Sequence, residues 1–227
     1  MAAGNPGTEP DEPQAVVDAI REAITSGDFA PNQRLVEQEL AEQFGASRAA
    51  VRNALLHLAS EGLVERIRNR GARVRAVSLA EAIEITEVRM ALEGICAARA
   101  AERATDDDRR ELREIGERMK EAVATGDVLG YSQLNKRLHD RIIELSGQAT
   151  ARAVLERLRL QNVRHQFRLA MHPGRPNVSL PQHLDIIEAV CTGAPEAAEA
   201  AARTHLRSVI DTLPEVENSR PRRLDTV

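Results

Sequence analysis

The segment SRAAVRNALLHL, residues 47–58, combines two patterns on one short stretch of chain. Its apolar residues recur at helical spacing and predict one buried face. They are Val51, Leu55 and Leu58. Arg48 and Arg52 lie one turn apart on a different face, next to Ser47, a residue type that often caps the start of a helix. The segment therefore predicts a short helix that packs into a domain and holds two guanidinium groups out at its N-terminal end.

The residues before this segment predict a second helix in contact with it. A helical pattern runs from about Val36 to Phe44 and ends at Gly45, in the position of a left-handed C-cap. Another apolar stripe begins at Gln14 and ends at Ser26-Gly27. A helix, a tight Gly turn and a Ser-capped helix form the helix-turn-helix arrangement, whose second helix enters the DNA major groove. We therefore expect Ser47, Arg48 and Arg52 to face base edges and phosphates.

The residues after the segment predict a basic β-hairpin. LVERIRNRGARVRAV, residues 63–77, reads as two short strands joined by a Gly turn at Gly71. A hairpin beside a recognition helix can lie along the DNA backbone as a wing, and Arg70 at its tip is expected to contact phosphate. Residues 46–75 hold seven arginines and two glutamates, a local charge of +5 in a chain of net charge −4. The position of this charge predicts DNA binding more strongly than either element alone.

At this point the sequence resembles a known family. The stretch AITSGDFAPNQRLVEQELAEQFGASRAAVRNALLHLASEGLVERIRNRGARV is similar to the winged-helix domain of the GntR regulators. The helical remainder resembles the effector domain of their FadR-type (FCD) branch, and the resemblance covers about residues 14–213. It implies that four positions contact operator DNA in a two-fold homodimer, namely Gln38, Arg48, Arg52 and Gly71. Gln38 stands where the family frequently has Arg. The chain also has Asn32 where the family usually has Gly, Ala50 where Pro is common and Asn53 where Glu is common.

Beyond Ser78 the strand signals vanish and the pattern is helical throughout. SLAE, residues 78–81, is a capping box that opens a long helix, and five further helices are expected. The fourth should run from about Thr150 to His172, and Pro181 should open the fifth after an entrance loop at residues 173–179. The predicted fold is mainly α: a winged helix-turn-helix at residues 14–77 and an all-α antiparallel bundle at 78–214. Residues 1–13 are expected to be a disordered arm and 215–227 a mobile tail.

Three histidines and an asparagine form the candidate metal site of the bundle. Asn135 and His139 are separated by one helical turn, and His183 and His205 stand at equal distances from the turn between the last two helices. An antiparallel hairpin brings that pair level, so three imidazoles and an amide oxygen can surround a divalent transition metal. Three unrelated polar residues are the alternative interpretation. The resemblance implies the same four ligands, with zinc, nickel or manganese as the ion.

Arg89 is a candidate effector-binding residue on the first helix of the bundle. It is flanked by apolar residues, and it either pairs with Glu93 or points inward to an anionic ligand. Similar effector domains often place an arginine near the ligand on this helix. The proposed ligand shell holds no negative charge, so a small carboxylate bound to the metal would lower the cost of burying the ion.

Composition narrows the class of protein further. No run of about 18 apolar residues exists, and the acidic, Pro/Gly-rich start lacks the features of a secretory signal, so a cytoplasmic protein is expected. Three Phe, one Tyr and no Trp disfavour stacking on single-stranded nucleic acid. We expect a ligand-responsive transcriptional repressor without enzymatic activity. The alternatives are a metal-dependent enzyme and a regulator that binds a bulky ligand without metal.

Overall fold

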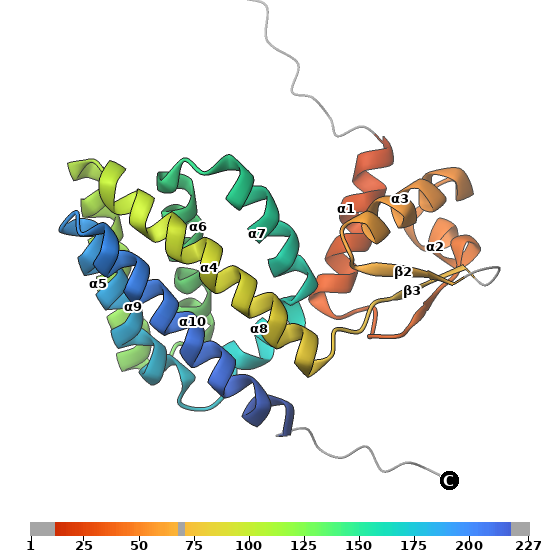
Figure 1. The fold of residues 1–227 in the computed structure, drawn as a ribbon. Coiled ribbons are helices and arrows are strands. Elements are labelled where there is room, and N and C mark those ends of the chain that lie inside the picture. Colours follow the sequence, from red (N-terminus) through yellow and green to blue (C-terminus); the bar gives the residue numbers. More distant parts are fainter. Residues whose placement is uncertain (1–11, 68–70, 219–227) are drawn as a thin grey trace, which may run out of the picture. The chain divides into compact units, whose positions relative to one another are not determined.

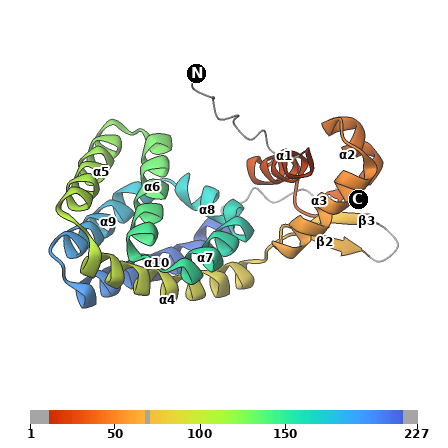
Figure 2. The same ribbon diagram turned by 90° about the horizontal axis from the view of Figure 1, so that it is seen from above.

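The chain forms two compact units in the computed structural model, which describes residues 12–67 and 71–218. The first unit extends to Ala76 and the second begins at Val77 (Figures 1 and 2). The predicted fold class is confirmed: a small winged helix-turn-helix unit precedes an all-helical one. No helix within the described ranges is long and apolar enough to cross a bilayer.

Three helices and a small sheet make up the N-terminal unit. α3 buries its apolar stripe against α1, and Gly45 ends α2 with the positive φ of 62° that glycine adopts without strain. The Ser47 hydroxyl accepts a hydrogen bond from the backbone N–H of Ala50 at 3.1 Å and so caps α3. The bounds are α1 Glu12–Ser26, α2 Glu37–Phe44 and α3 Arg48–Ser60.

The sheet has one strand more than the predicted hairpin. β2 (Val64–Ile67) and β3 (Gly71–Val74) pair antiparallel, and β1 (Arg34–Leu35) pairs with the other edge of β3. Asn32, just before β1, has a φ of 65°, which asparagine tolerates better than most residues. This left-handed backbone explains why an asparagine can stand where related sequences commonly have glycine.

Seven helices form the C-terminal unit. α4 runs side by side with α10 and also packs on α6, α7 and α9 (Figures 1 and 2). Buried alanines lie where the C-terminal half of α4 and the N-terminal half of α10 join the core, and their small side chains let helices approach closely: Ala97, Ala100, Ala101, Ala198 and Ala202. The bounds are α4 Leu79–Arg103, α5 Asp106–Thr125, α6 Val128–Ser146, α7 Ala149–Gln161, α8 Val163–Ala170, α9 Arg175–Cys191 and α10 Pro195–Asn218.

The long helix predicted for residues 150–172 is interrupted. The chain turns at Asn162, which is almost fully buried and donates a hydrogen bond from Nδ2 to the Thr86 hydroxyl of α4 at 3.4 Å. Asparagine favours caps and turns over helix interiors, and this contact holds its side chain against α4 at the residue where α7 ends. The expected single helix is therefore two helices, α7 and α8.

The expected entrance loop at residues 173–179 is wrong, because most of this segment is helical. α9 begins at Arg175, and Pro181 lies inside it rather than at its start. Pro181 cannot donate to the carbonyl of Asn177, but Asn177 is exposed, so water can satisfy that carbonyl. α10 likewise continues through Pro214 to Asn218, so residues 215–218 are helical rather than part of a mobile tail.

Candidate functional site

The N-terminal end of α3 presents its polar residues to solvent. Arg48 and Arg52 are both exposed, while the apolar residues of the same helix are buried in the unit. Neither guanidinium is needed to hold the helix in place. This arrangement leaves both charges available to a partner that approaches α3 from its capped end.

Arg52 is held by an acidic residue of α2. Its Nε lies 3.1 Å from Glu37 Oε1, and its Nη2 lies 2.8 Å from Glu37 Oε2. These hydrogen bonds lower the pKa of Glu37, and the charges of Arg48 and Arg66 lower it further. Three arginine charges therefore act on Glu37, and its carboxylate pre-orients Arg52 while it competes with any phosphate for that guanidinium.

The remaining candidate DNA contacts lie around the same unit. Gln38 is exposed on α2 and donates a hydrogen bond to Glu42 at 3.3 Å. Gly71 is exposed at the start of β3, with a φ of 90°. Arg70 falls outside the described residues.

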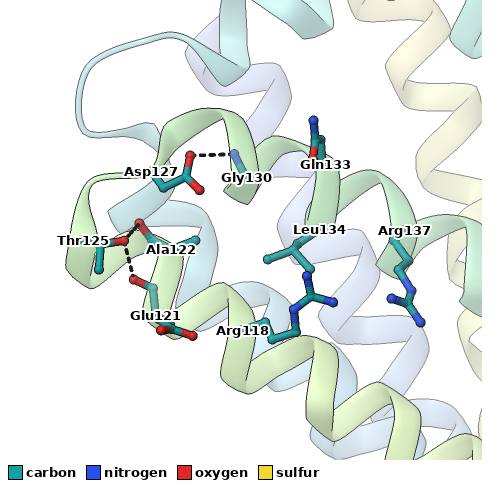
Figure 3. Close-up of a pocket in the computed structure, with 9 residues that line it drawn as sticks. All are labelled: Arg118, Glu121, Ala122, Thr125, Asp127, Gly130, Gln133, Leu134 and Arg137. Carbon is teal, nitrogen blue, oxygen red and sulfur yellow. Dashed lines mark hydrogen bonds between the residues drawn. The ribbon is translucent and has the colours of Figure 1, made fainter.

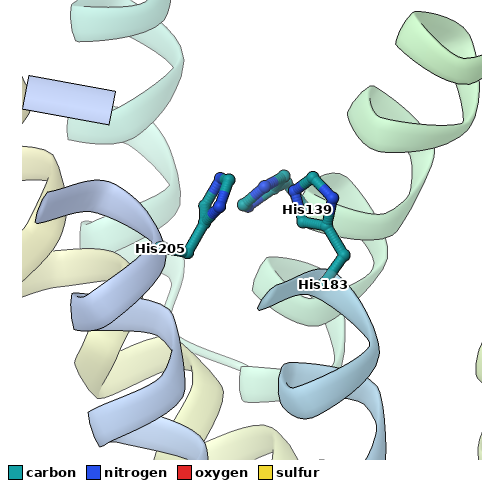
Figure 4. A group of neighbouring side chains, drawn as sticks. All are labelled: His139, His183 and His205. Atoms are coloured by element: carbon teal, nitrogen blue, oxygen red, sulfur yellow. The ribbon is translucent and has the colours of Figure 1, made fainter. Parts of the chain in front are cut away.

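In the C-terminal unit, the three candidate histidines meet between three helices. His139 comes from α6, His183 from α9 and His205 from α10, and their rings face one another (Figure 4). The ring centroids of His183 and His205 are 4.3 Å apart, and His139 lies 5.4 and 5.3 Å from them. One nitrogen from each ring lies within 4.8 Å of the others. A single ion with metal–nitrogen bonds of about 2.1 Å can join three such nitrogens after small side-chain shifts.

Each imidazole is oriented by a polar partner at its Nδ1. Glu93 Oε2 lies 2.9 Å from His139 Nδ1, the Tyr131 hydroxyl 2.8 Å from His183 Nδ1, and Gln182 Oε1 3.0 Å from His205 Nδ1. Metal-binding histidines characteristically donate the other ring N–H to such partners, which fixes ring orientation and tautomer. The arrangement leaves the three Nε2 atoms to face the centre of the cluster.

Two buried acceptors, one in the cluster and one a helical turn before His139 on α6, test whether a metal fits. His183 Nε2 and Asn135 Oδ1 are buried, and neither has a hydrogen-bond partner among the described residues. A buried polar atom without a partner costs free energy, which a bound cation would recover. Burial, with the neighbouring imidazoles, also lowers the pKa of His183 and His205 well below the ordinary value, so both rings are in the neutral form that ligates metals. The donor set therefore suits a divalent transition metal.

Arg89 is inside the bundle, but it is already paired. It is 7% exposed, and its Nε and Nη2 lie 3.0 and 2.9 Å from Glu93 Oε1. Arg159 Nη2 of α7 lies 3.4 Å from the same oxygen. Burial would raise the pKa of Glu93, but the two guanidinium charges outweigh it and hold the pKa well below the ordinary range. The side chain of Arg89 is thus both buried inside the bundle and paired with Glu93, so the two alternatives for its orientation do not exclude each other.

The sequence-based expectation of a site without negative charge was incomplete. Glu93 places a carboxylate directly behind His139. Both of its oxygens are engaged, one by arginines and one at the imidazole, so it is poorly placed to act as a general base.

The structure adds residues to the site that the sequence analysis missed. A signal existed for Tyr131, because it precedes Asn135 and His139 at intervals of four residues on α6. A second signal was Glu93, an acidic residue one helical turn after Arg89 on the same helix. Gln182 and Arg159 gave none, because their positions depend on tertiary packing.

A separate hollow of about 470 Å³ lies between α5 and α6 and contains none of these residues (Figure 3). It is lined mostly by polar side chains, including Arg118, Gln133 and Arg137. Arg137 is already paired with Glu111 at 2.8 Å. The hollow is therefore a groove in the surface, distinct from the buried histidine cluster.

The remaining histidines lie apart from the cluster. His57 is exposed on α3, with Nε2 3.2 Å from Glu61. His165 Nε2 lies 3.0 Å from the carbonyl oxygen of Val77.

Comparison with known proteins matches both units to described families. Residues 13–74 match the bacterial regulatory proteins of the gntR family, and residues 84–208 match the FCD domain. An HTH-type transcriptional regulator from an unstable DNA locus of Streptomyces ambofaciens is 31% identical, over 89% of this chain and 85% of its own length. The HTH-type transcriptional repressor RspR of Escherichia coli K12 is 27% identical over 91% of both chains.

Solved structures show the same fold. E. coli McbR/YncC superposes with a TM-score of 0.75 at 23% identity, covering 92% of this chain and all of that one. A GntR-type regulator from Rhodococcus sp. RHA1 gives 0.66 at 24% identity, covering 92% and 99%. The two family matches establish that the chain is a member of the gntR family of DNA-binding transcriptional regulators, with a C-terminal FCD domain, and this family and its named relatives are regulators rather than enzymes.

Proposed function

We propose that this regulator is a homodimeric repressor whose C-terminal domain binds a divalent metal and a small carboxylate effector. The observation that carries the proposal is the histidine cluster, in which three oriented imidazoles converge and His183 Nε2 is buried without a hydrogen-bond partner among the described residues. His139, His183, His205 and Asn135 would hold the ion. Zinc, nickel and manganese all accept such nitrogen and amide-oxygen donors.

The role of the metal is to bind the effector. A bound divalent ion supplies a Lewis-acidic centre that coordinates a carboxylate oxygen. The amide of Asn135 adds no charge to the shell, and Glu93 is already neutralised by Arg89 and Arg159. The site therefore favours an anionic ligand over a neutral one.

Effector binding would reach DNA through the helices that form the site. The cluster joins α6, α9 and α10, so a ligand held there stabilises one arrangement of these helices over others. In a two-fold dimer, such a change would alter the spacing of two winged-helix units on a near-palindromic operator. Gln38, Ser47, Arg48, Arg52, Arg70 and Gly71 are the proposed DNA contacts.

We propose that the regulator represses transcription. Its proposed location is the cytoplasm, where operator DNA is accessible. RspR is named as a repressor, and so is a relative from Paenarthrobacter nicotinovorans, described as a probable D-xylose utilization operon transcriptional repressor, which is 29% identical over 86% of this chain and 85% of its own length. Only one of the two names states what is regulated, so the relatives support the direction of control and not the identity of the effector.

The test begins with metal analysis of the purified protein. We expect about one divalent ion per chain, and its loss from a His139→Ala, His183→Ala double variant that remains folded. A matched control is His57→Ala, because His57 lies on the exposed surface of α3. An equal metal content in the double variant and the wild type would contradict the site.

Operator fragments recovered by binding selection would then be titrated with small carboxylates. We expect metal-loaded protein to change its operator affinity on effector addition, and metal-stripped protein to lose that response. A bulky ligand that copurifies without metal, detected by native mass spectrometry, would support the alternative of a metal-free regulator.

A further inference from the structure

Arg175 is a buried cation without an acidic partner among the described residues. It begins α9, is 6% exposed, and was not singled out by the sequence. Its Nη1 donates only to neutral acceptors of α10: the Ser208 carbonyl at 3.2 Å, the Ser208 hydroxyl at 3.0 Å and the Thr212 hydroxyl at 3.0 Å. Its Nη2 is buried without a hydrogen-bond partner among the described residues. One end of this guanidinium is thus fixed and the other is unsatisfied.

The other two arginines near the cluster, Arg89 and Arg159, are paired, which sets Arg175 apart. Arg89 binds Glu93, and Arg159 binds both Glu93 and Asp140. Burial lowers the pKa of Arg175, and no acidic side chain opposes that effect. An arginine remains charged in proteins, so this desolvated positive charge is uncompensated.

Helix geometry places Arg175 on the same face as the histidine cluster. On α9, Arg175, Ser179 and His183 repeat every four residues, and all three are buried. On α10, Ser208 and Thr212, which hold the guanidinium, follow His205 by one and two turns, or about 5–10 Å along the helix axis.

Tyr131 connects the two positions. Its hydroxyl lies 2.8 Å from His183 Nδ1. Burial raises the pKa of that hydroxyl, and the charge of Arg175 and a hydrogen bond with Ser179 oppose the increase.

We infer that Arg175 binds a second anionic group of the effector, about one to two helical turns from the histidine cluster, and that the effector is therefore a dianion such as a dicarboxylate. The inference rests on the proposed function for the first carboxylate and adds the recognition of the second. Arg89 does not fill this role, because its hydrogen bonds to Glu93 would have to break. Arg175 Nη2 can bind a ligand without breaking an existing hydrogen bond, and an oxyanion would give this atom the charged partner that it lacks.

The test compares ligands that differ by one charge at constant size. The probes are malonate, succinate, glutarate and adipate, each beside its half-amide, titrated calorimetrically into the protein with its metal content measured. We expect the best dicarboxylate to bind at least about tenfold more tightly than its half-amide. Arg175→Gln should remove this preference by weakening the dicarboxylate about tenfold, while half-amide affinity changes by less than about threefold. Arg175→Lys should restore part of the preference.

Arg203→Gln is the control, because Arg203 is an exposed arginine of α10 paired with Glu199. It should bind all probes as the wild type does. Equal affinity of the wild type for a dicarboxylate and its half-amide would overturn the inference, and so would failure of every dicarboxylate to bind. These wild-type outcomes do not depend on the folding of any variant. If metal-stripped and metal-loaded protein bind a dicarboxylate with equal affinity, the proposed contact between metal and carboxylate is refuted. The difference in dicarboxylate affinity between the wild type and Arg175→Gln would still show whether Arg175 binds the second carboxylate.

Discussion

The two units of this regulator place arginine in opposite environments. In the winged-helix unit, Arg52 is exposed and paired with Glu37, whose side chain retains 26% of its exposure. In the helical unit, Arg89 is buried and paired with Glu93, whose side chain is 4% exposed. Both are arginine–glutamate pairs of similar length, so the difference between them is the surrounding solvent.

Solvent determines what each pair can do. Water screens an exposed pair and lets it exchange partners at little cost, which suits a residue that must bind phosphate or a base. A buried pair cannot be opened without leaving a desolvated charge, so it fixes the structure around it. Exposed arginines in this protein are thus available to bind DNA. A buried arginine indicates a ligand site mainly when it lacks an acidic partner.

The largest expected effect comes from removing the carboxylate of the buried pair. Glu93→Gln would leave Arg89 and Arg159 without their shared counterion, and we expect it to lower the free energy of unfolding by about 3–5 kcal/mol. Urea denaturation measures the change. Glu37→Gln is the matched control and should unfold close to the wild-type midpoint. Similar midpoints for the two variants would remove the distinction between the pairs.

The next effect concerns the exposed arginines themselves. An Arg48→Ala, Arg52→Ala double variant should bind operator DNA about 10- to 100-fold more weakly, because two charged contacts to phosphates or base edges are lost. Its urea midpoint should stay at the wild-type value, because neither side chain is buried. Fluorescence anisotropy with a labelled operator measures the affinity. Unchanged affinity would exclude α3 as the recognition helix.

The smallest expected effect is on operator affinity and comes from the glutamate of the exposed pair. Glu37→Gln removes the carboxylate that competes for Arg52, and we expect it to raise operator affinity by about threefold at low salt. The gain should shrink as salt rises, because screening weakens both the competing pair and the phosphate contact. A loss of affinity would show instead that Glu37 orients Arg52 for DNA.

The two units also differ in how much of them the sequence predicted. Ser47 and Gly45 specify the helix-turn-helix locally, since a cap and a left-handed turn depend on a few neighbouring residues. The convergence of His183 and His205 followed from their equal distances to the turn near Ala194. Such arguments succeed where helix geometry alone fixes the answer.

Sequence patterns failed where tertiary packing decides. The break at Asn162 depends on a hydrogen bond to Thr86, which lies 76 residues earlier. Proline is common at helix starts, which predicts a start at Pro181, but the exposed residue one turn earlier lets water reach the unpaired carbonyl and so allows proline inside α9. The same misplaced start assigned Arg175 to a loop and hid the buried cation. Local rules do not report which distant residue satisfies a polar group.

The position of α10 affects the order in which the chain matures during synthesis. The N-terminal unit is complete within the first 76 residues, and domains commonly fold as units while translation proceeds. The histidine cluster needs His205, which belongs to the last of the described helices. A nascent chain can therefore complete its DNA-binding unit well before its sensing site exists, and a product truncated before α10 would retain the former without the latter.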